Sequence, residues 1–152
     1  SSDYHNQDKV DHMDQKVAQS FIDEMWMDSI VPELVEYIKI PNKSPHFDAD
    51  WQEHGYMEDA VQQIFSWCKA QEVKGMTLDI VRLEGRTPLI FMEIPAQGDV
   101  DADDTILMYG HLDKQPEMTG WAEGLGPWIL VVAVVFLTAG SCLFQPLLRF
   151  PC

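Results

Sequence analysis

The most informative stretch of this chain is residues 105–128, which read T-I-L-M-Y-G-H-L-D-K-Q-P-E-M-T-G-W-A-E-G-L-G-P-W. It opens with an apolar run at residues 106–109 that is short enough for a buried strand. Gly110 then leads into a segment dense in Gly, Pro and polar residues, which is typical of a loop. We therefore expect a strand that ends at a loop carrying chemistry.

His111 and Asp113 follow directly after the predicted strand. In an extended chain, residues two apart project from the same face of the backbone. An imidazole can bind a divalent cation through one ring nitrogen while a neighbouring carboxylate fixes the orientation of the ring. The spacing therefore suits a metal site, although an isolated His at a strand end is more often a hydrogen-bonded structural residue.

The stretch resembles the first metal-binding motif of the M20 zinc metallopeptidases, in their dipeptidase-like (carnosine dipeptidase) branch. The shared features are Gly110, the His-x-Asp pair, Pro116 and a Gly-Trp pair at residues 120–121, in that order. Two upstream segments, at residues 37–45 and 83–88, are similar to the same branch. The resemblance covers about residues 14–128 and does not reach the end of the chain.

The resemblance implies an α/β catalytic domain in which His111 is the first zinc ligand and Asp113 is the catalytic-site carboxylate that orients it. The intact family enzyme binds two zinc ions per site, hydrolyses dipeptides or similar small amides, and can form homodimers. The paired metals polarise the scissile carbonyl and lower the pKa of a bound water. The family's remaining ligands and its general base would follow Trp128, and none can be assigned here. We therefore expect this chain alone to be an inactive, truncated form.

Composition narrows the function classes. With 152 residues, 46% of them hydrophobic, the chain can form one modest domain with a core. A net charge of -15 excludes nucleic acid as a partner, because a phosphate backbone would be repelled. The three cysteines form no C-x-x-C site and favour a reducing compartment. Together with an N-terminus that lacks a signal-peptide pattern, they predict a cytoplasmic location.

Helices are predicted in the first half of the chain. Apolar residues at positions 10, 13, 17, 21 and 25 recur at three- and four-residue steps, which indicates an amphipathic helix. Pro32 is interpreted as a first-turn residue of a second helix, with Ser29 as a candidate cap. A further helical region is predicted over residues 51–71, ended by Gly75.

Strands are predicted after these helices. Residues 78–83 and 89–94 are rich in branched apolar side chains and flank a turn at residues 85–88. With the strand expected at residues 105–109, the order becomes helices followed by three strands, which is the opening of an α/β fold with a mixed sheet. By resemblance, this is an incomplete zinc-peptidase catalytic domain spanning residues 1–128.

Residues 129–152 form an apolar tail unrelated to the M20 family. Residues 129–148 contain no charged side chain and are long enough to cross a bilayer. Three interpretations stay open: a buried strand over residues 129–137, a membrane or partner anchor, or a tail produced by a frameshift, altered splice or truncated gene model. The alternative function is accordingly a non-enzymatic fragment or tail-anchored pseudo-enzyme attached through residues 129–148.

The remaining polar and aromatic candidates receive weaker interpretations. His5 and His12 are expected to be exposed to solvent, and His46 and His54, which flank Trp51 in a polar region, are not expected to contact a metal. Trp121 and Trp128 are expected to anchor the loop to the core. Arg86 and Lys114 are interpreted as solvated turn residues, with binding of a substrate carboxylate left open. The family loop that matches residues 41–45 lies near the active site, but no role is assigned to Asn42 or Ser44.

Overall fold

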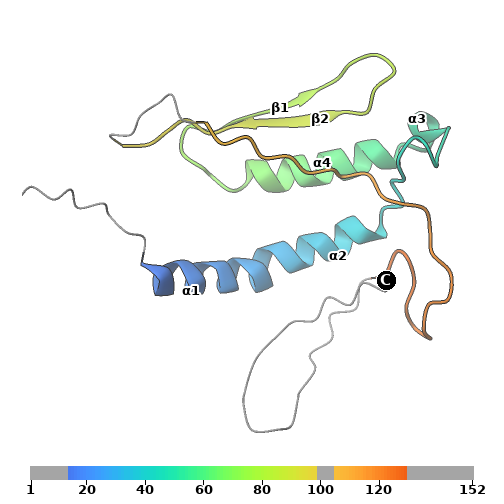
Figure 1. The fold of residues 1–152 in the computed structure, drawn as a ribbon, viewed down its shortest axis with the longest axis horizontal. Helices are drawn as coiled ribbons and strands as arrows, with labels where there is room; N and C mark the ends of the chain where they lie inside the picture. Colours follow the sequence, from blue (N-terminus) through green and yellow to red (C-terminus); the bar gives the residue numbers. More distant parts are fainter. Residues whose placement is uncertain (1–13, 99–104, 130–152) are drawn as a thin grey trace, which may run out of the picture. The chain divides into compact units, whose positions relative to one another are not determined.

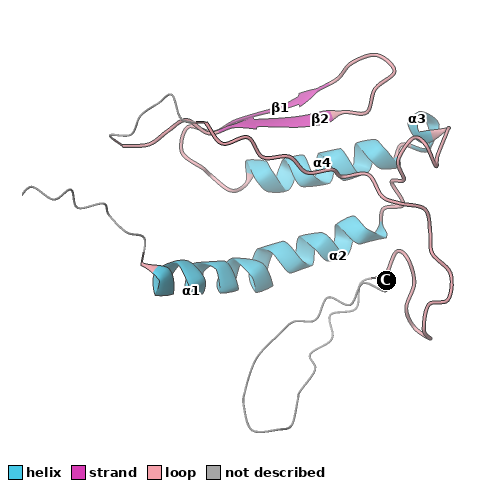
Figure 2. Cartoon of the chain, viewed as in Figure 1, coloured by secondary structure: helices cyan, strands magenta, loops and turns pink. Residues whose placement is uncertain are grey.

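The computed structural model describes residues 14–98 and 105–129 (Figure 1). Its elements are, in chain order, α1 (Gln15–Met25), a π-helical turn η1 (Trp26–Ile30), α2 (Val31–Lys39), α3 (Trp51–His54), α4 (Tyr56–Lys69), β1 (Thr77–Val81) and β2 (Leu89–Glu93). Helices therefore precede a two-stranded antiparallel sheet (Figure 2). The chain divides into two compact units between Leu34 and Val35.

The first unit contains α1, which confirms the predicted amphipathic helix from Gln15 onward. Asp14 caps this helix, because its carboxylate accepts hydrogen bonds from Lys16 N at 2.8 Å and Val17 N at 3.3 Å. These bonds satisfy amides that have no partner within the helix. No residue of α1 is buried. The part of the predicted helix at residues 10–13 lies outside the described residues.

The chain stays helical between α1 and α2, so the prediction that Ser29 caps a separate helix is wrong. Ser29 instead lies inside η1, and the Val31 N–H donates to the Trp26 carbonyl five residues earlier. Pro32 lies in the first turn of α2, as expected. Proline has no N–H to donate and its ring crowds the preceding turn, and a wider π-turn accommodates both effects without ending the helix.

In the second unit, the predicted helical region over residues 51–71 is two helices. Gly55 takes a left-handed backbone conformation with φ of 74°, which ends α3 and precedes α4. Glycine adopts this conformation without the steric penalty that a Cβ would cause. The second helix ends at Lys69, well before Gly75.

The core of the second unit lies where α4 contacts the hairpin (Figure 2). Met57, Ala60 and Val61 of α4 are the buried hydrophobic residues of the described part of the chain. Both predicted strands are confirmed, and Ile80 of β1 lies opposite Ile90 of β2. The alternating burial of β1, together with the contacts of both strands with α4, shows that one face of the hairpin packs toward the helix.

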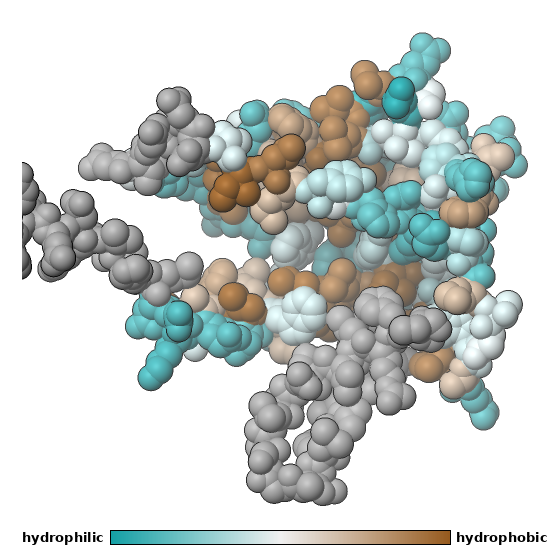
Figure 3. Space-filling model, in the orientation of Figure 1, coloured by the Kyte–Doolittle hydropathy of each residue, from teal (hydrophilic) through white to brown (hydrophobic). Residues whose placement is uncertain are grey.

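The third strand, predicted at residues 105–109, is wrong. These residues form no strand, and the side chains at positions 106–109 are between 87% and 91% exposed. The described sheet is consequently antiparallel and not mixed. Apolar composition alone does not make a strand, because a strand requires a neighbour for its backbone and a surface for its side chains. Apolar side chains also lie at the surface shown in Figure 3.

Within residues 14–98 and 105–129, each helix is too short or too polar to traverse a lipid bilayer. The interpretations of the apolar tail fall on residues 130–152, which lie outside the described part of the chain.

Candidate metal-ligand site

Residues 112–114 are held by the loop that follows α2. The Lys114 N–H donates to the Asn42 carbonyl at 2.9 Å, and the Ser44 N–H donates to the Lys114 carbonyl at 2.9 Å. These bonds form an isolated parallel bridge between Lys43 and Lys114. The segment that carries Asp113 is thereby fixed against residues far earlier in the sequence.

The carbonyl of Leu112 receives two more hydrogen bonds from the same region. Asn42 Nδ2 donates to it at 2.8 Å, and the Tyr37 hydroxyl also donates to it. Asn42 is only 1% exposed, and its Oδ1 has no hydrogen-bond partner within the described residues. A buried side-chain amide is costly unless it is hydrogen-bonded, so the bond from Asn42 to Leu112 is structurally important.

The ammonium of Lys114 lies at the C-terminal end of α2. Its Nζ donates to the Tyr37 carbonyl at 2.6 Å and to the Ile40 carbonyl, and it lies 4.0 Å from the centre of the Tyr37 ring. The last carbonyls of a helix lack partners and attract a cation. The interpretation of Lys114 as a solvated turn residue is therefore wrong. Burial lowers the pKa of Lys114 from its ordinary 10.5 to about 8.

We refer to Tyr37, Asn42 and Lys114, together with the backbone of residues 112–114, as the Lys114 clasp. Trp128 borders it, with its ring centre 5.7 Å from Lys114 Nζ. Sequence reasoning missed the clasp, because its contacts join residues about seventy positions apart. The only signal was the similarity of residues 37–45 to the M20 branch, whose loop lies near the active site.

His111 and Asp113 are brought together beside the clasp. His111 Nδ1 lies 3.0 Å from Asp113 Oδ1 and 3.0 Å from the Asp113 carbonyl oxygen. Both neighbours are acceptors, so Nδ1 carries the hydrogen and donates it. In the neutral ring the other nitrogen, Nε2, then keeps a free lone pair. The imidazole is 62% exposed, so this nitrogen is accessible to a ligand.

The other histidines make different contacts. His54 Nδ1 lies 2.9 Å from Asp48 Oδ2, and this hydrogen bond raises the pKa of His54. His46 makes an edge-on contact with the Phe47 ring at 4.9 Å. His5 and His12 lie outside the described residues.

The His111 and Asp113 pair does not complete a metal site by itself. In the described ranges, no group of three or more His, Cys, Asp or Glu side chains is placed to hold a metal ion. A catalytic zinc takes about three protein ligands. The residues described therefore fit one ligand position with its orienting carboxylate, and no step of peptide hydrolysis follows from them alone.

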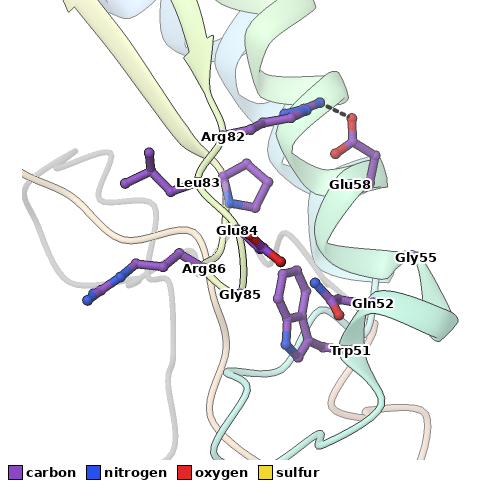
Figure 4. A pocket seen from close by; sticks show the side chains of 10 residues that line it. Trp51, Gln52, Gly55, Glu58, Arg82, Leu83, Glu84, Gly85 and Arg86 are labelled. Atoms are coloured by element: carbon purple, nitrogen blue, oxygen red, sulfur yellow. Dashed lines mark hydrogen bonds and ion pairs between the residues drawn. The ribbon is translucent and has the colours of Figure 1, made fainter.

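A cleft of about 340 Å³ lies elsewhere in the second unit, where α3 and the start of α4 face the loop after β1 (Figure 4). Arg82 and Glu58 form an ion pair at its edge, while Glu84 points toward Trp51 and Arg86 extends away from it. Neither His111 nor Asp113 lines this cleft. Arg86 is exposed, consistent with a solvated turn residue.

Comparison of the chain with models of known protein families gave no match, and comparison with curated proteins gave none either. The resemblance to the M20 metallopeptidases therefore rests on the motif residues quoted above.

Proposed function

We propose that residues 14–128 are the N-terminal part of a zinc-dependent metallopeptidase of the M20 type, acting on dipeptides or similar small amides. In this proposal His111 supplies one imidazole ligand and Asp113 orients it. The observation that supports it is the 3.0 Å contact between His111 Nδ1 and Asp113 Oδ1, which leaves Nε2 free on an exposed ring. A carboxylate on the far nitrogen is the usual partner of a zinc-binding imidazole.

The remaining ligands and the general base have to come from outside the described residues. When bound, zinc would polarise a substrate carbonyl and activate a water. The contribution of this chain is narrower, because it holds the proton on Nδ1 of His111 and keeps the ring in one orientation. We accordingly expect the purified chain to show no zinc-dependent hydrolysis of a dipeptide panel.

Calorimetric titration with zinc tests the ligand assignment. His111→Ala is compared with His54→Ala, which removes a second exposed imidazole whose Nδ1 also contacts a carboxylate. We expect zinc binding that His111→Ala weakens by at least about tenfold and His54→Ala leaves unchanged. The His54 variant controls for nonspecific binding by a surface imidazole.

Two results would contradict the proposal. Equal zinc affinity in the wild type and His111→Ala would remove His111 from the ligand set. Equal losses in the two variants would mean that any exposed His and carboxylate pair binds zinc as well as this one, so the motif would have no special role.

A further inference from the structure

The chain before His111 and the chain after it differ in how firmly they are held. The residues just before it, at positions 106–109, are almost fully exposed and belong to no strand. The residues just after it, at positions 112–114, receive hydrogen bonds from the loop after α2. The position of the imidazole therefore depends on how firmly residues 112–114 are held.

Among the residues that hold this segment, Lys114 makes the hydrogen bond that spans the greatest distance along the sequence, 77 positions. Its backbone belongs to the segment that carries Asp113, while its ammonium reaches the carbonyls of Tyr37 and Ile40 at the end of α2. The Tyr37 ring lies below the same ammonium at 4.0 Å, which adds a cation–π attraction. Tyr37 also donates through its hydroxyl to Leu112, so Lys114 and Tyr37 hold each other in place.

The contacts of Lys114 can affect the His111 imidazole because Asp113, which contacts the ring, lies between the two residues in the sequence. His111 Nδ1 faces both the carboxylate and the main-chain carbonyl of Asp113. The carbonyl of Asp113 is bonded directly to the nitrogen of Lys114, and that N–H donates to Asn42. Any release of Lys114 therefore changes the orientation of the peptide group that His111 contacts.

We propose that Lys114 is a positioning residue for the His111 and Asp113 pair, acting by fastening residues 112–114 to the end of α2. In this role Lys114 acts through its hydrogen bonds to the carbonyls of Tyr37 and Ile40, and it needs no contact with a metal or a substrate. Its effect on zinc affinity rests on the proposed function, whereas its effect on the His111 ring does not.

The test uses nuclear magnetic resonance of the ring nitrogens of His111, which reports which nitrogen carries the hydrogen. Lys114→Met keeps the aliphatic stem but removes the ammonium, and Lys114→Arg restores a cation with donors. Lys39→Met is the matched control, because Lys39 lies at the same helix end and its ammonium pairs with Glu36 of the same helix, at 2.6 Å.

We expect the wild type to hold the hydrogen on Nδ1. Lys114→Met should shift the ring toward a mixture of tautomers, Lys114→Arg should restore the wild-type state at least in part, and Lys39→Met should leave it unchanged. If zinc binds through His111, its affinity should fall by about tenfold in Lys114→Met, the lower end of the range for residues that orient a ligand.

An unchanged tautomer in a folded Lys114→Met variant would overturn the positioning role, whether or not zinc binds. Absence of zinc binding in the wild type would count against the proposed function only, since the ring measurement needs no metal. If Lys114→Met fails to fold, Tyr37→Phe decides the matter, because it removes a donor to Leu112 without removing the ring below Lys114. A shift toward mixed tautomers in Tyr37→Phe supports the clasp, and no shift contradicts it.

Discussion

Protonation of the Lys114 side chain should affect the stability of the second unit. Burial lowers its pKa from 10.5 to about 8. Between these two values the unfolded chain binds more protons at this residue than the folded chain does. The unfolding free energy should therefore rise with pH from about 8 toward 10.5, and the penalty for holding the charged form should be fully present below about pH 8.

Urea unfolding of the wild type and Lys114→Met at several pH values between about 8 and 10 would measure this effect. We expect a more positive slope of stability with pH in the wild type than in the variant. Measurements should stop near pH 10, because burial also raises the pKa of Tyr37 above its ordinary 10.0, and this shift lowers the unfolding free energy as the pH rises further. Parallel slopes in the two proteins would show that Lys114 titrates normally.

Only those contacts of the site that join residues close together in the sequence could be predicted from the sequence. His111 and Asp113 are two residues apart, so their spacing alone favoured an interaction, and the structure places them 3.0 Å apart. The partners of Lys114 lie 74 and 77 positions away, in a loop and a helix end. No periodicity or spacing in the sequence indicates such a contact, because it arises from how the backbone segments pair.

At the level of elements, alanine substitutions at Gly55 and Gly75 distinguish the cost of backbone strain from the cost of steric crowding. Gly55 and Gly75 have nearly the same φ, 74° and 75°. A Cβ at Gly55 would meet no atom within 4 Å, whereas a Cβ at Gly75 would lie 2.9 Å from Cγ of Pro95. The proline ring cannot swing away as a flexible side chain can. Alanine should therefore be strained at both positions and crowded at only one.

We expect Gly55→Ala to cost about 1 kcal/mol of unfolding free energy, from the left-handed backbone alone. Gly75→Ala should cost at least about 1 kcal/mol more, because overpacking adds to the strain. Urea unfolding followed by tryptophan fluorescence measures both. Gly75→Ala, Pro95→Ala should recover the extra cost, and equal losses in the two single variants would exclude a clash with Pro95.

The sequence predicted the helices and strands that depend on a pattern within a short segment, and it failed where an element depends on a distant segment. Helical periodicity identified α1 and α4, and branched apolar residues identified β1 and β2, which are joined by a short loop. The run at residues 106–109 has equally strong strand character but is nearly fully exposed. Its pairing depends on a neighbouring strand, which composition cannot supply. The π-turn before Pro32 was missed because it changes the hydrogen bonding without changing the pattern of apolar residues.

For the whole molecule, exposed apolar surface and net charge have opposite effects. The exposed run at residues 106–109 favours contact between molecules, because association would remove its side chains from water. The charge of -15 opposes contact, because every copy repels every other. Salt weakens only the repulsion. The screening length falls from about 30 Å at 0.01 M to about 3 Å at 1 M.

We therefore expect the chain to associate more strongly as ionic strength rises. Sedimentation velocity at low and high salt measures this, and Leu107→Asp should reduce the association at high salt. Gln52→Asp is the matched control, since it adds the same charge at an exposed position that is already polar. If both variants reduce association equally, added charge is the cause and the apolar run is not the contact. If only Leu107→Asp does so, residues 106–109 are the surface through which the molecules meet.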